Sequence, residues 1–359
     1  MRQPDPLGAT AVLDRPTPAG HRGGAQRTSA RGPVLWLVGA ALALALCCIA
    51  SMAIGARPVG LGTLWGAWTS PDGANGDHAV VLSRLPRTAV GLLVGASLGL
   101  AGALMQGVTR NPLADPGILG VNAGAAVGVV VAISLLGVDS LADQLWFAFA
   151  GAGVAALVVY AVAGLGREGA TPVTLALAGA GLSAGLSSLV HGVLVASQET
   201  LDAFRFWQVG SLSGRTLESM LPAVPFVVVA AVLALGAGRV LNGLALGDDA
   251  ARGLGQRVGR DRAAVALAVV VLCGAATAVA GPIAFVGLVV PHVARALVGG
   301  DYRFVLPLSM LLAPVLLIGA DVVGRVVLPP SEVPAGVMTA VIGGPVFIWL
   351  VRRQRAVRL

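Results

Sequence analysis

The amino-acid sequence predicts an all-α polytopic membrane protein with ten transmembrane helices. Hydrophobic residues make up 56% of its 359 positions and charged residues 11%, less than half of the roughly 25% that is usual in soluble domains. Because a spanning helix needs about 20 apolar residues, the hydrophobic content suffices for roughly ten spans. This composition excludes a soluble enzyme, a disordered chain and a disulfide-stapled secreted domain.

Nine windows free of charged residues mark the candidate spans. They follow a Pro-, Gly- and Arg-rich segment at 1–33, which we expect to be a disordered cytoplasmic tail. The window 263–294 would be about 48 Å long as one helix, against a hydrocarbon core of about 30 Å. Gly281-Pro282 interrupts it, so we expect one span at about 262–281 and a short one at about 283–295. The other windows are 34–56, 88–109, 116–138, 144–166, 169–198, 219–238, 304–320 and 333–351.

The arginines indicate the orientation of the spans. The chain contains no lysine, so all 24 basic residues are arginines. With ten spans and a cytoplasmic N-terminus, 18 arginines lie on the inner side and six on the outer side, whereas nine spans give 13 and 11. Cytoplasmic loops of membrane proteins carry an excess of basic residues. We therefore expect ten spans, with both termini, including the short tail 354–359, in the cytoplasm.

A pattern of small residues recurs at an offset of 179 residues. The stretches 95–102 and 274–281 both read Gly-Ala, four residues, then Ala-Gly, and the same offset brings Pro112 onto Pro291. With ten spans, the two copies cross the membrane in opposite directions. The pattern predicts an inverted repeat, a common plan in transporters, whose substrate path lies where the halves meet. The alternative is chance, because small residues recur wherever membrane helices pack closely.

No catalytic or metal-binding constellation is evident, and we expect no cofactor. The histidines are scattered, without metal-ligand spacing, and the missing lysine excludes a standard ATP-binding P-loop. Asp321 lies four residues before Arg325 within an expected span, so the two share a helix face and can neutralise each other. We interpret His191, also within a span, as a neutral side chain bonded to a neighbouring helix. The alternative is a secondary transporter coupled to protons through Asp321 or His191.

Three loops on the expected inner side stand out. The loop 111–116 contains two prolines, which fix its shape, and residues 167–174 connect the fourth and fifth spans. The longest loop, 241–262, contains a short predicted helix that Asp248 could cap and that Gly253 and Gly255 end. A helix on the cytoplasmic face suits docking to a soluble partner, and a solvated connector is the alternative.

Several stretches of the sequence, taken in order, carry a resemblance to a known family. The strongest are 281–292, which reads GPIAFVGLVVPH, and 343–347, which reads GGPVF. The others are RLPR at 84–87, Gly102 to Gln106, NPLADP at 111–116, Trp207 to Leu212 and LALG at 244–247. With these stretches the chain resembles the FecCD family of ABC importer permeases from about residue 34 to residue 353.

The resemblance implies a fold like that of the cobalamin importer permease, with a ten-helix permease domain at 34–353. It implies a dimer with a second copy or a homologous permease, an ATP-binding cassette ATPase dimer in the cytoplasm, and an extracytoplasmic substrate-binding protein. The expected function is the permease subunit of an ABC importer in the bacterial cytoplasmic membrane. An iron–siderophore complex is the favoured cargo over haem or cobalamin, and ATP hydrolysis is expected on a separate chain.

The resemblance also implies three contact regions. The ATPase is expected to contact the loop 241–262 through Leu246, Asp248, Ala251, Arg252 and Leu254. A cytoplasmic gate is expected at Asn111, Leu113, Thr171, Pro172 and Thr174, although other members often have a small polar residue in place of Pro172. Glutamates of the binding protein are expected to dock on Arg84, Arg87 and Arg325. The alternatives for these arginines are snorkelling toward lipid headgroups and, for Arg325, pairing with Asp321.

Overall fold

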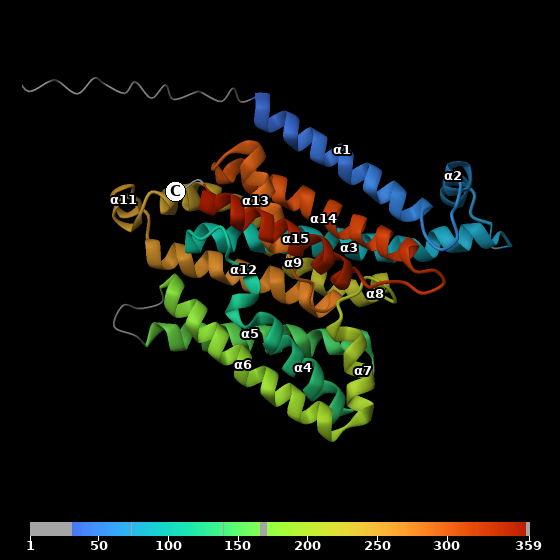
Figure 1. Ribbon diagram of the computed structural model, residues 1–359, viewed down its shortest axis with the longest axis horizontal. Helices are drawn as coiled ribbons and strands as arrows, with labels where there is room; N and C mark the ends of the chain where they lie inside the picture. The colour runs from blue at the N-terminus through green and yellow to red at the C-terminus, as the bar shows by residue number, and fades with distance from the viewer. Residues whose placement is uncertain (1–30, 73, 139, 166–170, 357–359) are drawn as a thin grey trace, which may run out of the picture.

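The computed structural model describes residues 31–72, 74–138, 140–165 and 171–356. Every regular element within these residues is a helix, and most helices run along the long axis of the molecule (Figure 1). The all-helical prediction is confirmed for this part of the chain. Most of the expected N-terminal tail, residues 1–30, and residues 357–359 of the expected C-terminal tail lie outside the described residues.

Seven of the described helical segments are long and apolar enough to cross a membrane, and three shorter apolar helices accompany them. Each of these ten segments overlaps one of the spans expected from the sequence. The shorter helices are α4 (Val121–Leu136), α13 (Val286–Val298) and the apolar part of α15 (Ala335–Ala356). The long ones are α1 (Arg31–Ala53), α3 (Gly76–Thr109), α5 (Leu141–Gly164), α6 (Pro172–Ala196), the run from α8 (Leu217–Met220) through η2 (Leu221–Ala223) to α9 (Val224–Gly236), α12 (Val258–Ala280) and α14 (Tyr302–Val327).

The chain leaves its helical path between α12 and α13, as the Gly281-Pro282 pair predicts. α12 ends at Ala280, and Gly281 follows with a φ of 77°. A side chain at Gly281 would overlap the carbonyl oxygen of Trp207, so both the conformation and the packing at this position require glycine. α13 begins at Val286. The window 263–294 therefore holds two separate helices.

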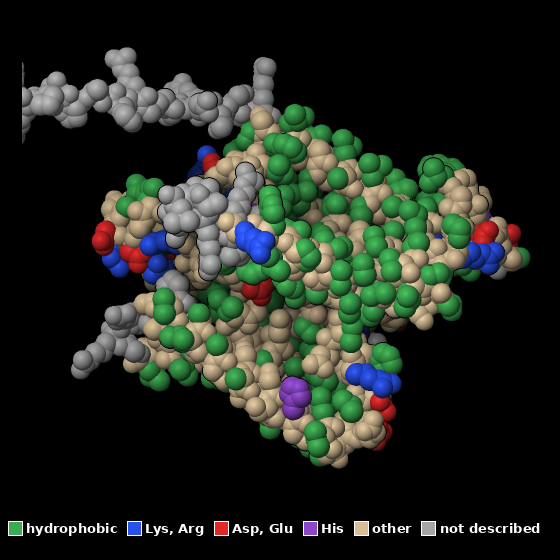
Figure 2. All heavy atoms as spheres, viewed as in Figure 1, with side chains coloured by type: hydrophobic (Ala, Val, Ile, Leu, Met, Phe, Trp, Pro, Cys, Tyr) green, Lys and Arg blue, Asp and Glu red, His purple; other side chains and the backbone are tan. Residues whose placement is uncertain are grey.

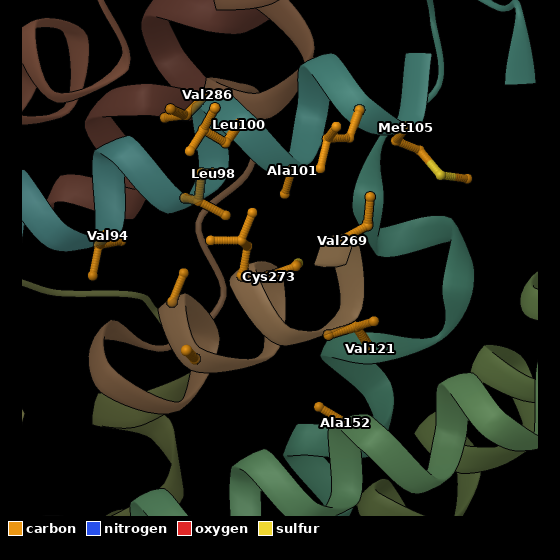
Figure 3. Close-up of a cluster of buried hydrophobic side chains, with 14 of the residues drawn as sticks. Val94, Leu98, Leu100, Ala101, Met105, Val121, Ala152, Val269, Cys273 and Val286 are labelled. Carbon is orange, nitrogen blue, oxygen red and sulfur yellow. The ribbon is translucent and has the colours of Figure 1, made fainter. Parts of the chain in front are cut away.

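α3 and α12 form the centre of the bundle. α3 packs against α12, α13 and α14, and α12 also packs against α5 and α9. Figure 3 shows Leu98 and Ala101 of α3 among the buried side chains of α12. A side chain at Gly102 would overlap the backbone of Gly287 in α13, so the small residue lets these helices approach closely. The small residues singled out in the sequence thus serve helix packing.

Charged side chains gather at the two ends of the long axis, and apolar side chains cover much of the length between them on the face seen in Figure 2. One end carries α10 (Gly238–Ala245), α11 (Asp248–Gly253) and the end of α15, and the opposite end carries α2 (Leu61–Thr69) (Figure 1). α7 (Gln198–Gln208) follows α6. This distribution suits a bundle that crosses a bilayer with both ends in water.

Candidate functional site

α11 lies in the longest of the three expected inner loops, between α10 and α12. Gly247, with a φ of 109°, precedes the helix, and no side chain caps it. Leu246 and Leu254 flank α11 and expose 68% and 66% of their surface, and Arg252 is also exposed. We call these three residues the α11 surface. It offers apolar groups to a partner, together with the guanidinium of Arg252, which pairs with the exposed carboxylate of Asp249 at 2.9 Å.

Two residues expected on this surface have other roles. Asp248 does not cap the helix but is its first residue, and its carboxylate accepts hydrogen bonds from Arg262, at 2.9 Å, and from Arg110. Desolvation raises the pKa of Asp248, but the hydrogen bonds and charges of the two arginines outweigh it and lower the pKa overall. Ala251 is fully buried, because one face of this short helix packs against the bundle.

Arg110 connects α11 with the expected gate. It ends α3 in the left-handed conformation, with a φ of 50°, and its Nε donates to the carbonyl oxygen of Leu244 at 2.6 Å. Its guanidinium also pairs with Asp248, and Asn111 follows directly. Sequence reasoning missed this residue because its acidic partner lies 138 positions away. An arginine directly before the NPLADP stretch was the available signal.

The first gate loop is held by its own side chains. The Asn111 side chain accepts a hydrogen bond from the backbone N–H of Leu113 at 3.0 Å, and Leu113 itself is 37% exposed. Asp115 accepts from the N–H of Gly117 at 2.8 Å and so caps η1 (Pro116–Leu119). These bonds fix the loop where it leaves α3.

The second gate loop ends in the first turn of α6. Thr171 and Thr174 form a reciprocal capping box there, and Pro172 occupies the first helical position, where it is well tolerated. η1 packs against α6, with Ile118 next to Gly179, so this short helix connects the first gate loop to the helix that the second gate loop enters. Residues 167–170 of the second loop lie outside the described residues.

Near the C-terminal end of α14, Asp321 lies between two guanidinium groups. Its side chain is 1% exposed and accepts hydrogen bonds from Arg325, at 2.8 Å, and from Arg87, at 2.9 Å. The Asp321–Arg325 pair is the predicted i, i+4 pair and is confirmed. Arg87 comes from α3 instead, and it also contacts Glu332, in the loop between α14 and α15, at 2.7 Å.

Arg84 and Arg325 point into the protein, which corrects the expectation that they project toward a docking partner. Arg325 donates to the carbonyl oxygen of Ser51 and Arg84 to that of Met52, both at 2.8 Å. These oxygens belong to the last turn of α1, where carbonyl groups lack helical partners and the helix dipole favours cations. The two arginines therefore complete the C-terminus of α1. Arg87 keeps 12% of its side chain exposed.

Within the described part of the chain, His191 bonds within its own helix and not to a neighbouring helix, which corrects the expectation from the sequence. It is exposed on α6, and its Nδ1 lies 2.6 Å from the carbonyl oxygen of Ser187 in the same helix. Among the described residues, no group of three or more His, Cys, Asp or Glu side chains could hold a metal ion.

Residues 34–353 match the model of the FecCD transport family. The chain belongs to this family. FecCD is a family of transport proteins, and membership indicates no catalytic role for this chain.

Individual relatives are similar in sequence or structure over most of the chain. The ferric enterobactin transport system permease protein FepD of Escherichia coli (strain K12) is 50% identical over 279 residues, which cover 77% of this chain and 83% of FepD. The probable siderophore transport system permease protein YfiZ of Bacillus subtilis (strain 168) is 46% identical over 297 residues, which cover 81% of this chain and 89% of YfiZ. A solved structure of a metal-chelate type ABC transporter in an inward-facing conformation has a TM-score of 0.78 and 29% identity, and covers 89% of this FecCD member and 99% of the other chain.

Proposed function

We propose that this chain is the permease subunit of a binding-protein-dependent ABC importer for iron–siderophore or ferric citrate complexes, in preference to haem or cobalamin. The observation that carries the proposal is the 50% identity with a ferric enterobactin permease. An Fe(3+)-citrate permease of Bacillus subtilis (strain 168) is 43% identical over 79% of this chain. The absence of lysine supports a division of labour in which a separate chain binds ATP.

We infer that all ten apolar segments cross the bacterial cytoplasmic membrane and that both termini are cytoplasmic. The positive-inside bias of the arginines supports this topology. An inverted repeat is supported by reciprocal packing, because α3 contacts α14 in the other half while α12 contacts α5. α3 carries the first copy of the repeated small-residue pattern and α12 the second, and these two helices contact each other at the centre of the bundle. Transporters with inverted repeats alternate access by rocking such halves against each other.

The ATPase contact is proposed at the α11 surface. Leu246 and Leu254 would enter an apolar groove of the ATPase, and Arg252 would meet acidic groups at its rim. Asp248 and buried Ala251 would act inside the permease, where they fix α11 to the bundle. Movement of α11 would then reach Asn111 through the pairing of Asp248 with Arg110.

The cytoplasmic gate is proposed at two loops, the one that precedes η1 and the one that enters α6, against which η1 packs. Leu113 is the exposed apolar side chain of the first loop, and the capping box of Thr171 and Thr174 gives the second loop a fixed start. In a permease dimer, Leu113 and its counterpart in the second subunit would close the path. The link to Arg110 would let the ATPase open it.

Binding-protein docking is proposed at Arg87. This guanidinium is partly exposed and already meets a carboxylate at its outer edge, that of Glu332. A glutamate of the binding protein could accept this charge-assisted hydrogen bond in place of Glu332. Arg84 and Arg325 would support the site from inside by holding the end of α1.

The test is uptake by purified components in proteoliposomes. The chain, its ATPase and its binding protein would be reconstituted with an iron–siderophore complex, and iron uptake would be measured with and without ATP. We expect uptake that requires ATP and the binding protein and resists a proton uncoupler. Uptake that persists without ATP and collapses with the uncoupler would instead support the proton-coupled transporter. The engagement of Asp321 by two arginines gives that alternative no support.

A further inference from the structure

Two apolar grooves flank α12 on its outward face. Leu267 and Val271 line both grooves and so form a ridge between them. The groove between α5 and α12 has a volume of about 430 Å³, and that between α9 and α12 about 390 Å³. Their linings contain no charged residue.

Aromatic rings close one end of both grooves. Phe149 of α5 and Phe226 of α9 each line one groove, and their ring centroids lie 5.3 Å apart. Trp146 packs edge-on against Phe226 at 6.1 Å. On the α5 side, the first groove extends from Phe149 to Tyr160, which is about 16 Å along a helix. The grooves therefore start near the middle of the bundle and run toward the end where α12 begins.

An arginine lies beyond the end of the grooves that is closest to the start of α12. Arg260 is exposed and lies one helical turn before Ala263 and Ala264, each of which lines one groove. Among the described residues it forms no ion pair or side-chain hydrogen bond, whereas Arg262 pairs with Asp248. Arg257, also exposed, lies one turn earlier on the same stripe. Tyr160, 41% exposed, lines the first groove at this end.

The exposed apolar side chains around the grooves indicate that this face of the protein contacts lipid. Several side chains that line the grooves are large, apolar and exposed, among them Leu157 at 68%, Val229 at 61% and Leu267 at 63%. In a protein that crosses a bilayer, such a face contacts acyl chains. A ligand of these grooves therefore comes from the membrane and not from water.

We propose that the grooves bind one anionic phospholipid that straddles α12. One acyl chain occupies each groove, on either side of the Leu267–Val271 ridge. The headgroup phosphate accepts hydrogen bonds from Arg260, with Arg257 adding positive charge. Guanidinium groups favour phosphate through bidentate hydrogen bonding, and basic pockets between membrane helices bind acidic headgroups. Arg257 and Arg260, neither of which forms an ion pair among the described residues, favour a headgroup with net negative charge over a zwitterionic one.

Binding would be measured by native mass spectrometry of the full-length chain in detergent, titrated with phosphatidylglycerol or with phosphatidylcholine of the same acyl chains. Gly153→Leu fills the first groove, because a side chain there meets no atom within 4 Å. Gly39→Leu, in α1, is the matched control with equally open surroundings. Arg260→Gln removes the headgroup contact, and Arg239→Gln is the control, because Arg239 is exposed but lines neither groove.

We expect Gly153→Leu to weaken binding of both lipids about tenfold, and Gly39→Leu to leave both unchanged. Arg260→Gln should weaken phosphatidylglycerol binding about fivefold and spare phosphatidylcholine, as expected for one arginine near an acidic headgroup. If Gly153→Leu binds lipid as Gly39→Leu does, no acyl chain occupies the groove. If Arg260→Gln behaves as Arg239→Gln does, or weakens both lipids equally, the assignment of an anionic headgroup is wrong.

Discussion

Arg110, the residue that ends α3, is paired with Asp248, the first residue of α11. The pair joins the surface proposed to contact the ATPase to the loop proposed to close the transport path. Arg110 also donates to Leu244, at the end of α10, so it holds two elements of this end together. A movement of α11 therefore has a direct route to Asn111.

Arg110→Gln should uncouple ATP hydrolysis from transport. We expect iron uptake in proteoliposomes to fall about fivefold, the effect of losing a partly exposed ion pair of about 1 kcal/mol, while the ATPase rate is retained. Arg205→Gln is the control, because it removes an exposed pair with Asp202 that lies outside this network. Equal loss of uptake and ATPase activity would point to failed assembly instead of lost coupling.

The same pair should be insensitive to pH in the neutral range. Because the pKa of Asp248 is lowered, the pairing contributes fully above the ordinary pKa of about 3.9 and is lost as pH falls through the lowered value. Uptake by the wild-type chain and by the Asp248→Asn variant, measured between pH 5 and pH 8, should therefore differ by a constant factor. A factor that changes with pH in this range would contradict the assignment.

Ala251→Pro should disrupt the proposed ATPase contact without preventing membrane insertion. The N–H of Ala251 donates to the carbonyl oxygen of Gly247 at 2.9 Å, and proline removes that bond and unwinds the helix. Co-purification of the ATPase with the permease should fall, and uptake should fall with it. Leu254→Asp, which alters the α11 surface but leaves the helix intact, should weaken co-purification as well. Wild-type uptake in Ala251→Pro would mean that α11 does not couple the ATPase.

Loss of the buried carboxylate should destabilise the permease. Asp321→Asn leaves Arg325, which is 2% exposed, without its acidic partner, and breaking a buried ion pair costs about 3–5 kcal/mol. We expect a clear drop in the thermal unfolding temperature in detergent. Asp202→Asn, in the exposed pair with Arg205, is the matched control and should unfold as the wild type does. An unchanged unfolding temperature in Asp321→Asn would show that the pair is not structural.

The sequence predicted the parts of this structure that depend on local pattern. Apolar windows predicted the long helices because a spanning segment is continuous in sequence, and Gly281-Pro282 predicted the break because both residues act on their own backbone. Asp321 and Arg325 could be paired because helix geometry brings residues four apart onto one face.

The contacts that sequence reasoning missed depend on tertiary packing. Arg87 reaches Asp321 across 234 positions, and Arg325 reaches Ser51 across 274. No pattern within one element predicts which helix end lies beside which arginine. Arg84 and Arg325 were therefore expected at the surface, although they complete the C-terminus of α1. α7, which lies outside the charge-free windows except for its first residue, Gln198, was not predicted either.

Cysteine cross-linking should test the proposed gate. Leu113→Cys, in a background in which the three native cysteines (Cys47, Cys48 and Cys273) are replaced by alanine, would place a thiol in each subunit of the proposed dimer. We expect a disulfide or a short bifunctional cross-link to form in one nucleotide state and to be lost in another. The control is Leu246→Cys in the same background, because α11 is proposed to face the ATPase and not the second permease. Equal cross-linking of Leu113→Cys in all nucleotide states would contradict a gate at this loop.

Substitution of Arg87 and substitution of Glu332 should change the association rate of the binding protein in opposite directions. Arg87 donates to Asp321 on its inner side and to Glu332 on its outer side, so a glutamate of the binding protein would compete with Glu332 for the outer edge. Arg87→Gln should slow association and reduce its dependence on salt, as is typical of rim charges. Glu332→Gln should do the reverse and speed association at low ionic strength, because it frees the guanidinium without removing it.

The association rate would be measured by surface plasmon resonance on the reconstituted permease between about 20 and 300 mM salt, a range over which the screening length falls severalfold. Slower association in both variants would mean that Glu332 itself belongs to the docking surface, and unchanged association in both would mean that Arg87 only joins α3 to α14.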